Sequence, residues 1–434
     1  MSDIALPIEI SEADTFPPIT ARQVTAAVAG NALEFYDFTV YATFASQIAH
    51  TFFPGRTPFL SLILTLATFG VGFLLRPIGA VVIGRWADRQ GRRPAMMFSF
   101  ALMGVSILGL ALTPSYATLG LAAPVLVLFW RLCQGFALGG EVGPTTAFLV
   151  EAAPPARRGY YGAWQGGSQN IANLVGGLVG VGLAHTLGEA SLNVWGWRVA
   201  FLLGTLVLPF GLILRRSLPE TLHRPEAHSH VHPDAATLRA SAPVLVRGLA
   251  LIAASTVSTY VFGYMTTYAL RTLHMAAEVS LAASAVSGTC GLVAGLIGGV
   301  LSDRFGRRPL MIWPRVVFLL ATWPAFHLLV RHPDAATLLG ATAVITFTSA
   351  LSTAAVFVSI TESLRKEVRV LGMGAVYATA VALFGGSTQP IIATLIEFTG
   401  DPMSPAWYMM AFTVIGLVAS VMTRETAHRR VGPL

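Results

Sequence analysis

Gly84-Arg-Trp-Ala-Asp88-Arg-Gln-Gly91-Arg-Arg93-Pro94 decides the fold, because its pattern returns 215 positions later as Gly299-Val-Leu-Ser-Asp303-Arg-Phe-Gly306-Arg-Arg308-Pro309. A second pattern, a glutamate followed by an arginine, recurs at an offset of 211 positions: Glu151 with Arg158, then Glu362 with Arg369. Two patterns that repeat at nearly one offset indicate an internal duplication. The chain should therefore consist of two similar halves.

Both copies of the first pattern stand between long apolar segments. The 434 residues are 54% hydrophobic and only 11% charged, whereas soluble proteins carry roughly 25% charged residues. The segment Phe59–Ile83 has one charge, Arg76, and is long enough to cross a hydrocarbon core of ~30 Å as a helix. The sequence predicts an all-α membrane protein with twelve transmembrane helices in two six-helix halves. The expected spans are Thr25–Ala49, Phe59–Ile83, Ala95–Leu112, Ala123–Val150, Tyr160–Leu187, Val199–Leu214, Leu249–Leu270, Leu281–Val300, Leu310–Val330, Thr337–Ile360, Leu371–Ile396 and Ala406–Met422.

The distribution of basic residues predicts the orientation in the membrane. With the N-terminus inside, 21 of the 28 Lys and Arg residues fall in inner segments and 4 in outer ones. Because positive charge accumulates on the cytoplasmic side, both termini should be cytoplasmic and the membrane should be the cell inner membrane. The domains are then a cytoplasmic tail (1–24), an N-terminal bundle (25–214), a cytoplasmic linker (215–247), a C-terminal bundle (248–423) and a cytoplasmic tail (424–434).

Other classes of protein find little support in the sequence. The acidic and proline-containing start, Met1–Thr20, does not have the pattern of a signal peptide. Cys133 and Cys290 lie in separate apolar segments, and no metal-ligand spacing occurs. The basic residues stand at helix ends rather than in a patch, so nucleic acid is not expected. We expect no enzyme activity, no cofactor, no metal and no obligate protein partner.

The repeated loop resembles the signature of the major facilitator superfamily. Three further stretches are similar to its metabolite–proton symporter family: Gly30-Asn31-Ala-Leu-Glu34-Phe-Tyr-Asp37-Phe38, Arg76-Pro77-Ile78-Gly79 and Trp195-Gly-Trp-Arg198. The stretches around Arg131-Leu-Cys-Gln134-Gly135-Phe136 and Phe384–Pro390 resemble bacterial citrate–proton symporters most closely. The resemblance implies import of citrate or tricarballylate with protons by alternating access. Because related proteins carry α-ketoglutarate, shikimate, or proline and betaine, these metabolites are alternative substrates. A membrane sensor is a different alternative, but it would need a sizeable soluble output domain.

Two acidic residues in the first helix are candidates for proton coupling. Glu34 and Asp37 are three positions apart and share a helical face with Asn31. Two carboxylates this close in an apolar medium do not both ionise easily, so one should hold a proton near neutral pH. The alternative is a structural pair neutralised by Arg76 or Arg131, and the sequence does not choose between the two acids.

Arginines and polar side chains inside the spans are candidates for substrate binding. A guanidinium binds a carboxylate through two parallel hydrogen bonds. Arg76 is therefore the first choice for contact with a substrate carboxylate, and Arg131 is the second. The alternative for Arg131 is a fixed salt bridge to the first helix. Arg315, near the start of the ninth helix, is expected to reach the cytoplasmic surface and has no assigned role. Polar groups complete the expected site, unless they only join helices: Asn31, Gln165, Ser168, Gln169, Asn173, Tyr260, Tyr264, Thr267 and Tyr268. Since most buried charge falls in the first half, the second half is expected to form mainly the opposing wall.

The repeated loops also predict a gate. The resemblance implies that Asp88 and Arg92 form a cytoplasmic latch, with Glu151 or Glu362 as partner, and that Asp303 and Arg307 are their counterparts. The alternative is that the arginines only satisfy the charge bias. Glu141 lies toward the same end and is assigned to the gate. Small-residue patterns predict seams on which the halves can rock: Gly288, Gly291, Gly295 and Gly299 in the eighth helix, and Gly176, Gly177 and Gly180 in the fifth.

Overall fold

The computed structural model describes residues 21–55, 57–90, 92–139, 149–150, 153–205, 235–364 and 369–427. Glu141 and Glu151 lie outside these residues, as do the side chains of Asp88 and Arg92, so their gate roles stay predictions. The described chain is helical and contains no strand. An all-helical chain agrees with the prediction from composition.

Helices of the first part of the chain follow the predicted spans, with breaks inside two of them. The span Thr25–Ala49 divides at Phe44, and the span Phe59–Ile83 divides at Leu75. The second break lies two residues before Pro77, which has no N–H to donate. The helices are α1 (Ala21–Thr43), α2 (Ala45–Phe52), α3 (Pro58–Leu74), α4 (Arg76–Gln90), α5 (Arg92–Leu112), α6 (Tyr116–Leu119), α7 (Ala122–Leu138), the 3-10 turn η2 (Pro155–Arg157), α9 (Arg158–Ser191) and the π-helical turn η3 (Leu192–Gly196), after which residues 197–205 are helical.

Helices of the second part begin earlier than expected. The helix α11 starts at Ala235, inside the segment expected to be linker, and continues through Pro243. The remaining expected linker residues up to 234 lie outside the described chain. The elements are α11 (Ala235–Arg271), α12 (Ala277–Phe305), α13 (Arg307–Arg331), α14 (Ala335–Ser363), α15 (Arg369–Ala380), the π-helical turn η6 (Val381–Gly385), α16 (Gly386–Thr399) and α17 (Ser404–Met422).

Several helices have the length and composition needed to cross a membrane. Within the described residues, eight helical segments meet this requirement, and two shorter apolar helices accompany them. One of the eight, Arg158–Thr205, is 48 residues long and contains Gly188 at φ 70°, ψ 165°, where the helical path is interrupted. The structure thus supports a multi-pass membrane protein, without itself giving the predicted count of twelve.

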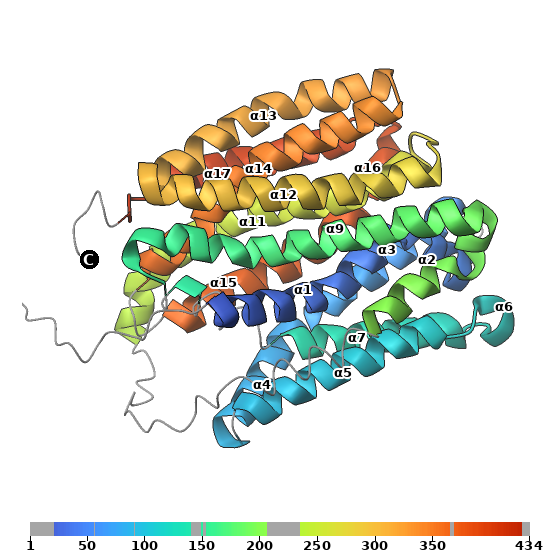
Figure 1. Ribbon diagram of the computed structural model, residues 1–434, viewed down its shortest axis with the longest axis horizontal. Coiled ribbons are helices and arrows are strands. Elements are labelled where there is room, and N and C mark those ends of the chain that lie inside the picture. The colour runs from blue at the N-terminus through green and yellow to red at the C-terminus, as the bar shows by residue number, and fades with distance from the viewer. Residues whose placement is uncertain are drawn as a thin grey trace, which may run out of the picture.

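The two long helices α9 and α12 lie side by side through the middle of the molecule (Figure 1). On one side are α1, α4, α5 and α7; on the other are α13, α14 and α17 (Figure 1). The descriptive name "central seam" is used below for the contact between α9 and α12. This seam joins the first part of the chain to the second.

Glycines allow the backbones of the central seam to approach closely. A Cβ on Gly177 would lie 2.3 Å from the main-chain nitrogen of Ala285, and one on Gly288 would lie 2.2 Å from that of Leu174. These contacts agree with the predicted packing role of the glycines, because only a residue without a side chain fits there. Gly295 differs: a Cβ on it would meet nothing within 4 Å, and this glycine instead lines a cavity.

Candidate functional site

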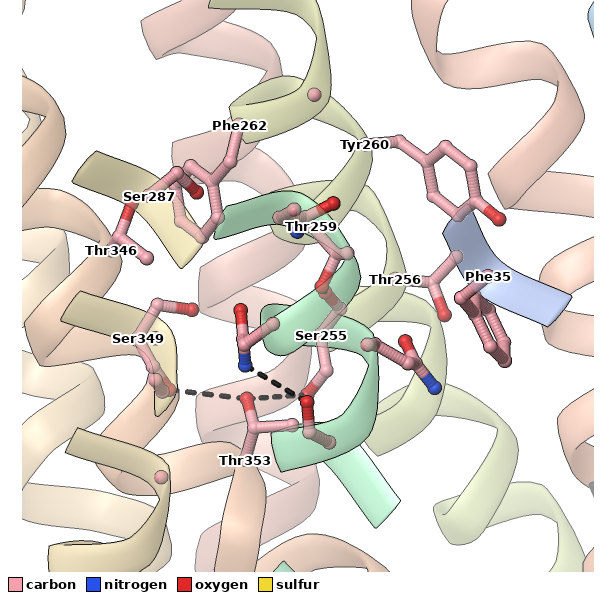
Figure 2. A pocket seen from close by; sticks show the side chains of 18 of the residues that line it. Phe35, Ser255, Thr256, Thr259, Tyr260, Phe262, Ser287, Thr346, Ser349 and Thr353 are labelled. Carbon is pink, nitrogen blue, oxygen red and sulfur yellow. Dashed lines mark hydrogen bonds between the residues drawn. The ribbon is translucent and has the colours of Figure 1, made fainter. Parts of the chain in front are cut away.

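A cavity of about 140 Å³ lies between the two parts of the chain. Hydroxyl groups from the second part form much of its wall, namely Ser255, Thr256 and Thr259 of α11 and Ser349 and Thr353 of α14. Figure 2 shows Ser255 beside Thr353, with Thr256 next to Phe35. No Asp, Glu, Lys or Arg is among the described residues that line it. The expectation that the second half serves mainly as an opposing wall therefore understates its contribution of polar groups.

The first part of the chain supplies amides and aromatic rings to the same cavity. Gln169, Asn170 and Asn173 of α9 line it together with Phe38 and Thr39 of α1. The hydroxyl of Thr39 donates to the Oδ1 atom of Asn173 at 2.7 Å, so α1 and α9 meet at the wall. Of the polar residues predicted for the site, Gln169, Asn173 and Tyr260 line this cavity.

The other predicted polar residues of α1 and α9 lie behind the wall. The Nδ2 atom of Asn31 donates to the hydroxyl of Ser168 at 2.5 Å, and Ser168 in turn donates to the carbonyl oxygen of Gln165. All three side chains are buried. Asn31 and Ser168 thus form the interhelical hydrogen bond that was the alternative to substrate contact. The side-chain amide of Gln165 has no hydrogen-bond partner in the described chain.

Two tyrosines expected in the site lie elsewhere. Tyr268 donates its hydroxyl to the carbonyl oxygen of Pro402 at 2.8 Å and packs against Phe326, and Tyr264 is buried in the same apolar cluster. Neither tyrosine lines the cavity in this structure, because the face of α11 toward the cavity carries residues 255, 256, 259, 260 and 263. Tyr260, which was expected in the same site, lies on this face.

Asp37 and Arg131 form a fully buried ion pair. The Nη1 atom of Arg131 lies 3.1 Å from the Oδ2 atom of Asp37, and both side chains have 0% exposure. The same nitrogen donates to Gln134 at 2.6 Å. Arg131 is therefore in the salt bridge to the first helix that was its alternative, and it does not line the cavity. A buried pair of this kind is costly to break by removing one partner, by about 3–5 kcal/mol.

Arg76 is buried, and its guanidinium makes no hydrogen bond with the described residues. Its side chain is 3% exposed, and none of its three guanidinium nitrogens has a hydrogen-bond partner in the part of the chain that the structure describes. The guanidinium lies 4.7 Å from the ring centre of Phe38 and 4.2 Å from that of Phe73. Phe38 also lines the cavity, so its ring is shared by Arg76 and the cavity wall. Glu34 is also buried and lies near enough to Arg76 to interact with it electrostatically.

The second loop copy joins the two parts of the chain at one end of the molecule. The carboxylate of Asp303 accepts hydrogen bonds from the main-chain nitrogens of Gly159 at 2.7 Å and Tyr160 at 2.9 Å, at the start of α9. Arg307 donates to Asp303 at 2.6 Å and to Glu362 through both Nε and Nη2, at 3.2 and 3.1 Å. The structure brings together the predicted gate residues Asp303, Arg307 and Glu362, called the gate cluster below.

Glu362 has partners in the gate cluster that were not predicted. It was a candidate partner for Asp88 and Arg92, whose side chains lie outside the described residues. It binds Arg307 and also accepts from the hydroxyl of Thr426 at 2.8 Å. Glu425 was missed: its carboxylate accepts from the main-chain nitrogens of Arg307 and Arg308, at the first turn of α13. A carboxylate is stabilised at a helix N-terminus. Since 118 positions separate Glu425 from Arg307, no local pattern could reveal this contact.

Arg315 does not reach the surface, contrary to the expectation. Its side chain is 3% exposed and donates to Gly416, Ser420 and Ser255. The expectation failed because α17 and α11 enclose the guanidinium before it can extend toward the helix end. Together with Arg307, it shows that the second part also contains buried charge.

An all-helical bundle with a polar cavity between two joined parts is the architecture of a membrane carrier. A family model described as the Major Facilitator Superfamily matches residues 27–387 and 249–433, and the chain belongs to this family of transporters. The citrate-proton symporter of Salmonella typhi is 38% identical over 417 residues, covering 93% of this chain and 95% of the relative. The citrate-proton symporter of Klebsiella pneumoniae is 38% identical over 400 residues, covering 92% and 90%.

The fold is also that of a solved transporter. The xylose transporter of E. coli, in a partially occluded inward open conformation, matches with a TM-score of 0.73 over 95% of this chain and 97% of that chain. The two sequences are 16% identical, so the likeness concerns the fold alone.

Proposed function

We propose that this protein is a proton-coupled symporter that imports citrate or a similar tricarboxylate, such as tricarballylate, by alternating access. The observation that carries the proposal is Arg76, a buried guanidinium with no hydrogen-bond partner in the described chain that lies against Phe38, a ring in the wall of a cavity rich in hydroxyls. A substrate carboxylate would satisfy its donors in bidentate fashion. The 38% identity to two citrate-proton symporters supports the same substrate class.

Proton coupling is assigned to the buried pair of Asp37 and Arg131, with Glu34 kept as a second candidate. A proton on Asp37 would neutralise the carboxylate and release the positive charge of Arg131 in a medium where charge is costly. An incoming anion would then offset that charge. The two side chains are 3.1 Å apart and fully buried, so protonation of Asp37 would strongly change the electrostatic environment of Arg131. This geometry supports the coupling.

Alternating access requires that the contacts between the halves break at one end at a time. We assign the gate cluster to the proposed cytoplasmic end, where its bonds to the start of α9 would hold the halves together. Opening to the cytoplasm would break the two main-chain hydrogen bonds of Asp303. The bonds of Arg307 to Glu362 lie within the second half and would persist.

The proposed topology has twelve crossings with both termini in the cytoplasm, and halves at 25–214 and 248–423. The interruption at Gly188 supports two crossings within Arg158–Thr205. The shorter apolar helices Met97–Leu112 and Ala122–Leu138 would add two more. The helix pair α1 and α2 would complete the twelve.

Other cargoes define the alternatives. α-Ketoglutarate and shikimate are anions and would also use Arg76. Proline and betaine carry a carboxylate as well but have no net charge, so they would not offset the positive charge of Arg76. The membrane is the proposed site of action, and no enzyme activity, cofactor, metal or obligate protein partner enters the proposal.

Uptake into proteoliposomes under an imposed pH gradient tests the function. Citrate, tricarballylate, α-ketoglutarate, shikimate and betaine are compared side by side, with and without the proton gradient. Accumulation of citrate or tricarballylate that collapses with a protonophore is expected. Accumulation of betaine alone, or of none of the five, would refute the proposal.

A further inference from the structure

Arg315 occupies a closed niche in the second half of the chain. Its Nη1 atom donates to the carbonyl oxygen of Gly416 at 2.8 Å and to the hydroxyl of Ser420 at 2.9 Å, both on α17. A Cβ on Gly416 would lie 2.8 Å from this nitrogen, so the absence of a side chain there makes room for the guanidinium. The niche therefore holds the planar group in one position.

The positive charge of this arginine is not neutralised by a neighbour. Among the described residues, no carboxylate lies within ion-pair distance of Arg315, in contrast to Arg131 and Arg307. All its bonds go to uncharged oxygens. A buried charge without a partner is costly in a membrane protein, and such groups are usually functional. Packing alone gives no reason for a guanidinium here.

Arg315 is connected to the transport cavity by one hydroxyl group. Its Nη2 atom donates to the Oγ atom of Ser255 at 3.3 Å, and Ser255 lines the cavity. Figure 2 shows Ser255 beside Thr353 of α14, whose hydroxyl lies 3.5 Å from the same oxygen. Ser255 now donates its proton to the carbonyl oxygen of Leu251. A rotation of this hydroxyl would instead direct the proton into the cavity, with the Arg315 charge behind it.

We infer that Arg315 is a second anion-positioning residue, acting through Ser255 on a carboxylate bound against α11 and α14. The inference rests on the proposed function and narrows its substrate class to anions with at least two carboxylates. One carboxylate would meet Arg76 in the first half and another would meet the Ser255 hydroxyl in the second. A polyanion of this kind would bridge the halves, and a monocarboxylate would not.

The test measures affinity and stability in the full-length protein. Arg315→Gln, Arg315→Lys and Ser255→Ala are compared with wild type for the uptake KM of citrate, α-ketoglutarate and acetate, and for the thermal unfolding midpoint. Arg198→Gln is the matched control, because the described bonds of Arg198 also go to uncharged oxygens, the carbonyls of Ala111 and Thr113, and Arg198 does not line the cavity.

The inference predicts a selective effect on polyanions. Arg315→Gln and Ser255→Ala should each raise the citrate KM at least about tenfold, as for the loss of one charge-supported hydrogen bond. Arg315→Lys should bind citrate more tightly than Arg315→Gln does. The double variant Arg315→Gln/Ser255→Ala should have the same citrate KM as Arg315→Gln alone, because the arginine acts through the serine. Arg198→Gln should leave the KM unchanged.

The failures are distinguishable. If wild type accumulates citrate while Ser255→Ala and Arg315→Lys both keep its KM, the inference is wrong and the proposed function stands. This holds even where Arg315→Gln does not fold. If Arg315→Gln only lowers the unfolding midpoint and leaves the KM ratio of citrate to acetate unchanged, Arg315 is purely structural. If wild type transports no carboxylate at all, the proposed function and the inference both fall.

Discussion

Replacement of Asp303 by Asn should release the contact between the halves at the gate cluster. The carboxylate accepts the two N–H groups at the start of α9, at 2.7 and 2.9 Å. Asn keeps one acceptor oxygen, so one of these bonds can survive. The other N–H then faces an amide group that cannot accept it, and the negative charge at the helix N-terminus is lost.

The size of the effect follows from these losses. One hydrogen bond to a charged group contributes about 1.5–3 kcal/mol, and a carboxylate at a helix N-terminus about 0.3–1 kcal/mol. The free energy that holds this end closed should therefore fall by about 2–4 kcal/mol, which corresponds to a roughly 30- to 700-fold shift toward the open state. The change leaves the bonds between Arg307 and Glu362 in place.

Labelling of a cavity cysteine measures this opening. Ser349 lines the cavity and is buried. A Ser349→Cys variant that lacks Cys133 and Cys290 therefore reports how easily a reagent in the surrounding solution reaches the cavity. Inside-out vesicles present the proposed cytoplasmic end to an impermeant maleimide. Asp303→Asn should raise the labelling rate at least about tenfold if closure limits access.

The matched control is a carboxylate with a similar local role that does not join the halves. Asp401 accepts from the main-chain nitrogen of Met403 at 2.8 Å and from the indole of Trp407, next to the start of α17. Asp401→Asn should leave the labelling rate unchanged. Equal labelling rates in wild type and a folded Asp303→Asn protein would show that Asp303 does not hold the gate.

Three further predictions concern the cavity and the seams. Arg76→Lys keeps the charge but loses the planar donors, so the citrate KM should rise at least about tenfold with little change in unfolding midpoint; an unchanged KM in uptake assays would remove Arg76 from the site. Asp37→Asn should abolish accumulation driven by a pH gradient yet leave citrate counterflow, and normal accumulation would place proton coupling elsewhere. Gly177→Ala would put a methyl 2.3 Å from the α12 backbone across the halves, whereas Gly139→Ala would put one 2.1 Å from the carbonyl of Arg76 within one half. Scanning fluorimetry should show the larger loss of stability, about 1–3 kcal/mol, for Gly139→Ala. Cavity labelling should rise only for Gly177→Ala. A larger loss of stability for Gly177→Ala, with increased labelling for Gly139→Ala, would contradict these assignments.

The sequence predicted best the features that repeat or depend on hydropathy. The duplicated loop drew attention to Asp303 and Arg307, because the same charges recur where orientation alone does not require an aspartate, and the structure brings these two side chains together beside the start of α9. The glycines of the central seam could be found because small residues at a spacing of three or four mark close helix contacts. These signals are local, and each is visible without knowledge of which helices are neighbours.

The features that failed depend on how one helix is rotated against another. Polar and aromatic groups occur on two faces of α11, and sequence alone could not show that Tyr260 lines the cavity while Tyr264 and Tyr268 face an apolar cluster. Arg131 had two possible roles until the positions of α1 and α7 placed it beside Asp37. The niche of Arg315 is formed by residues about a hundred positions away on α17. Contacts at such separations are set by tertiary packing.

The glycine contacts of the central seam should also influence how fast the two helices can move past one another. Side chains that interlock must change rotamer or separate before two helices can shift, and each such step adds to the activation barrier. Where α9 meets α12 through Gly177 and Gly288, main chain lies against main chain and little has to disengage. If the halves rock as proposed, breaking the polar contacts at the ends should limit the turnover number, and the long surface between them should add little resistance to the motion.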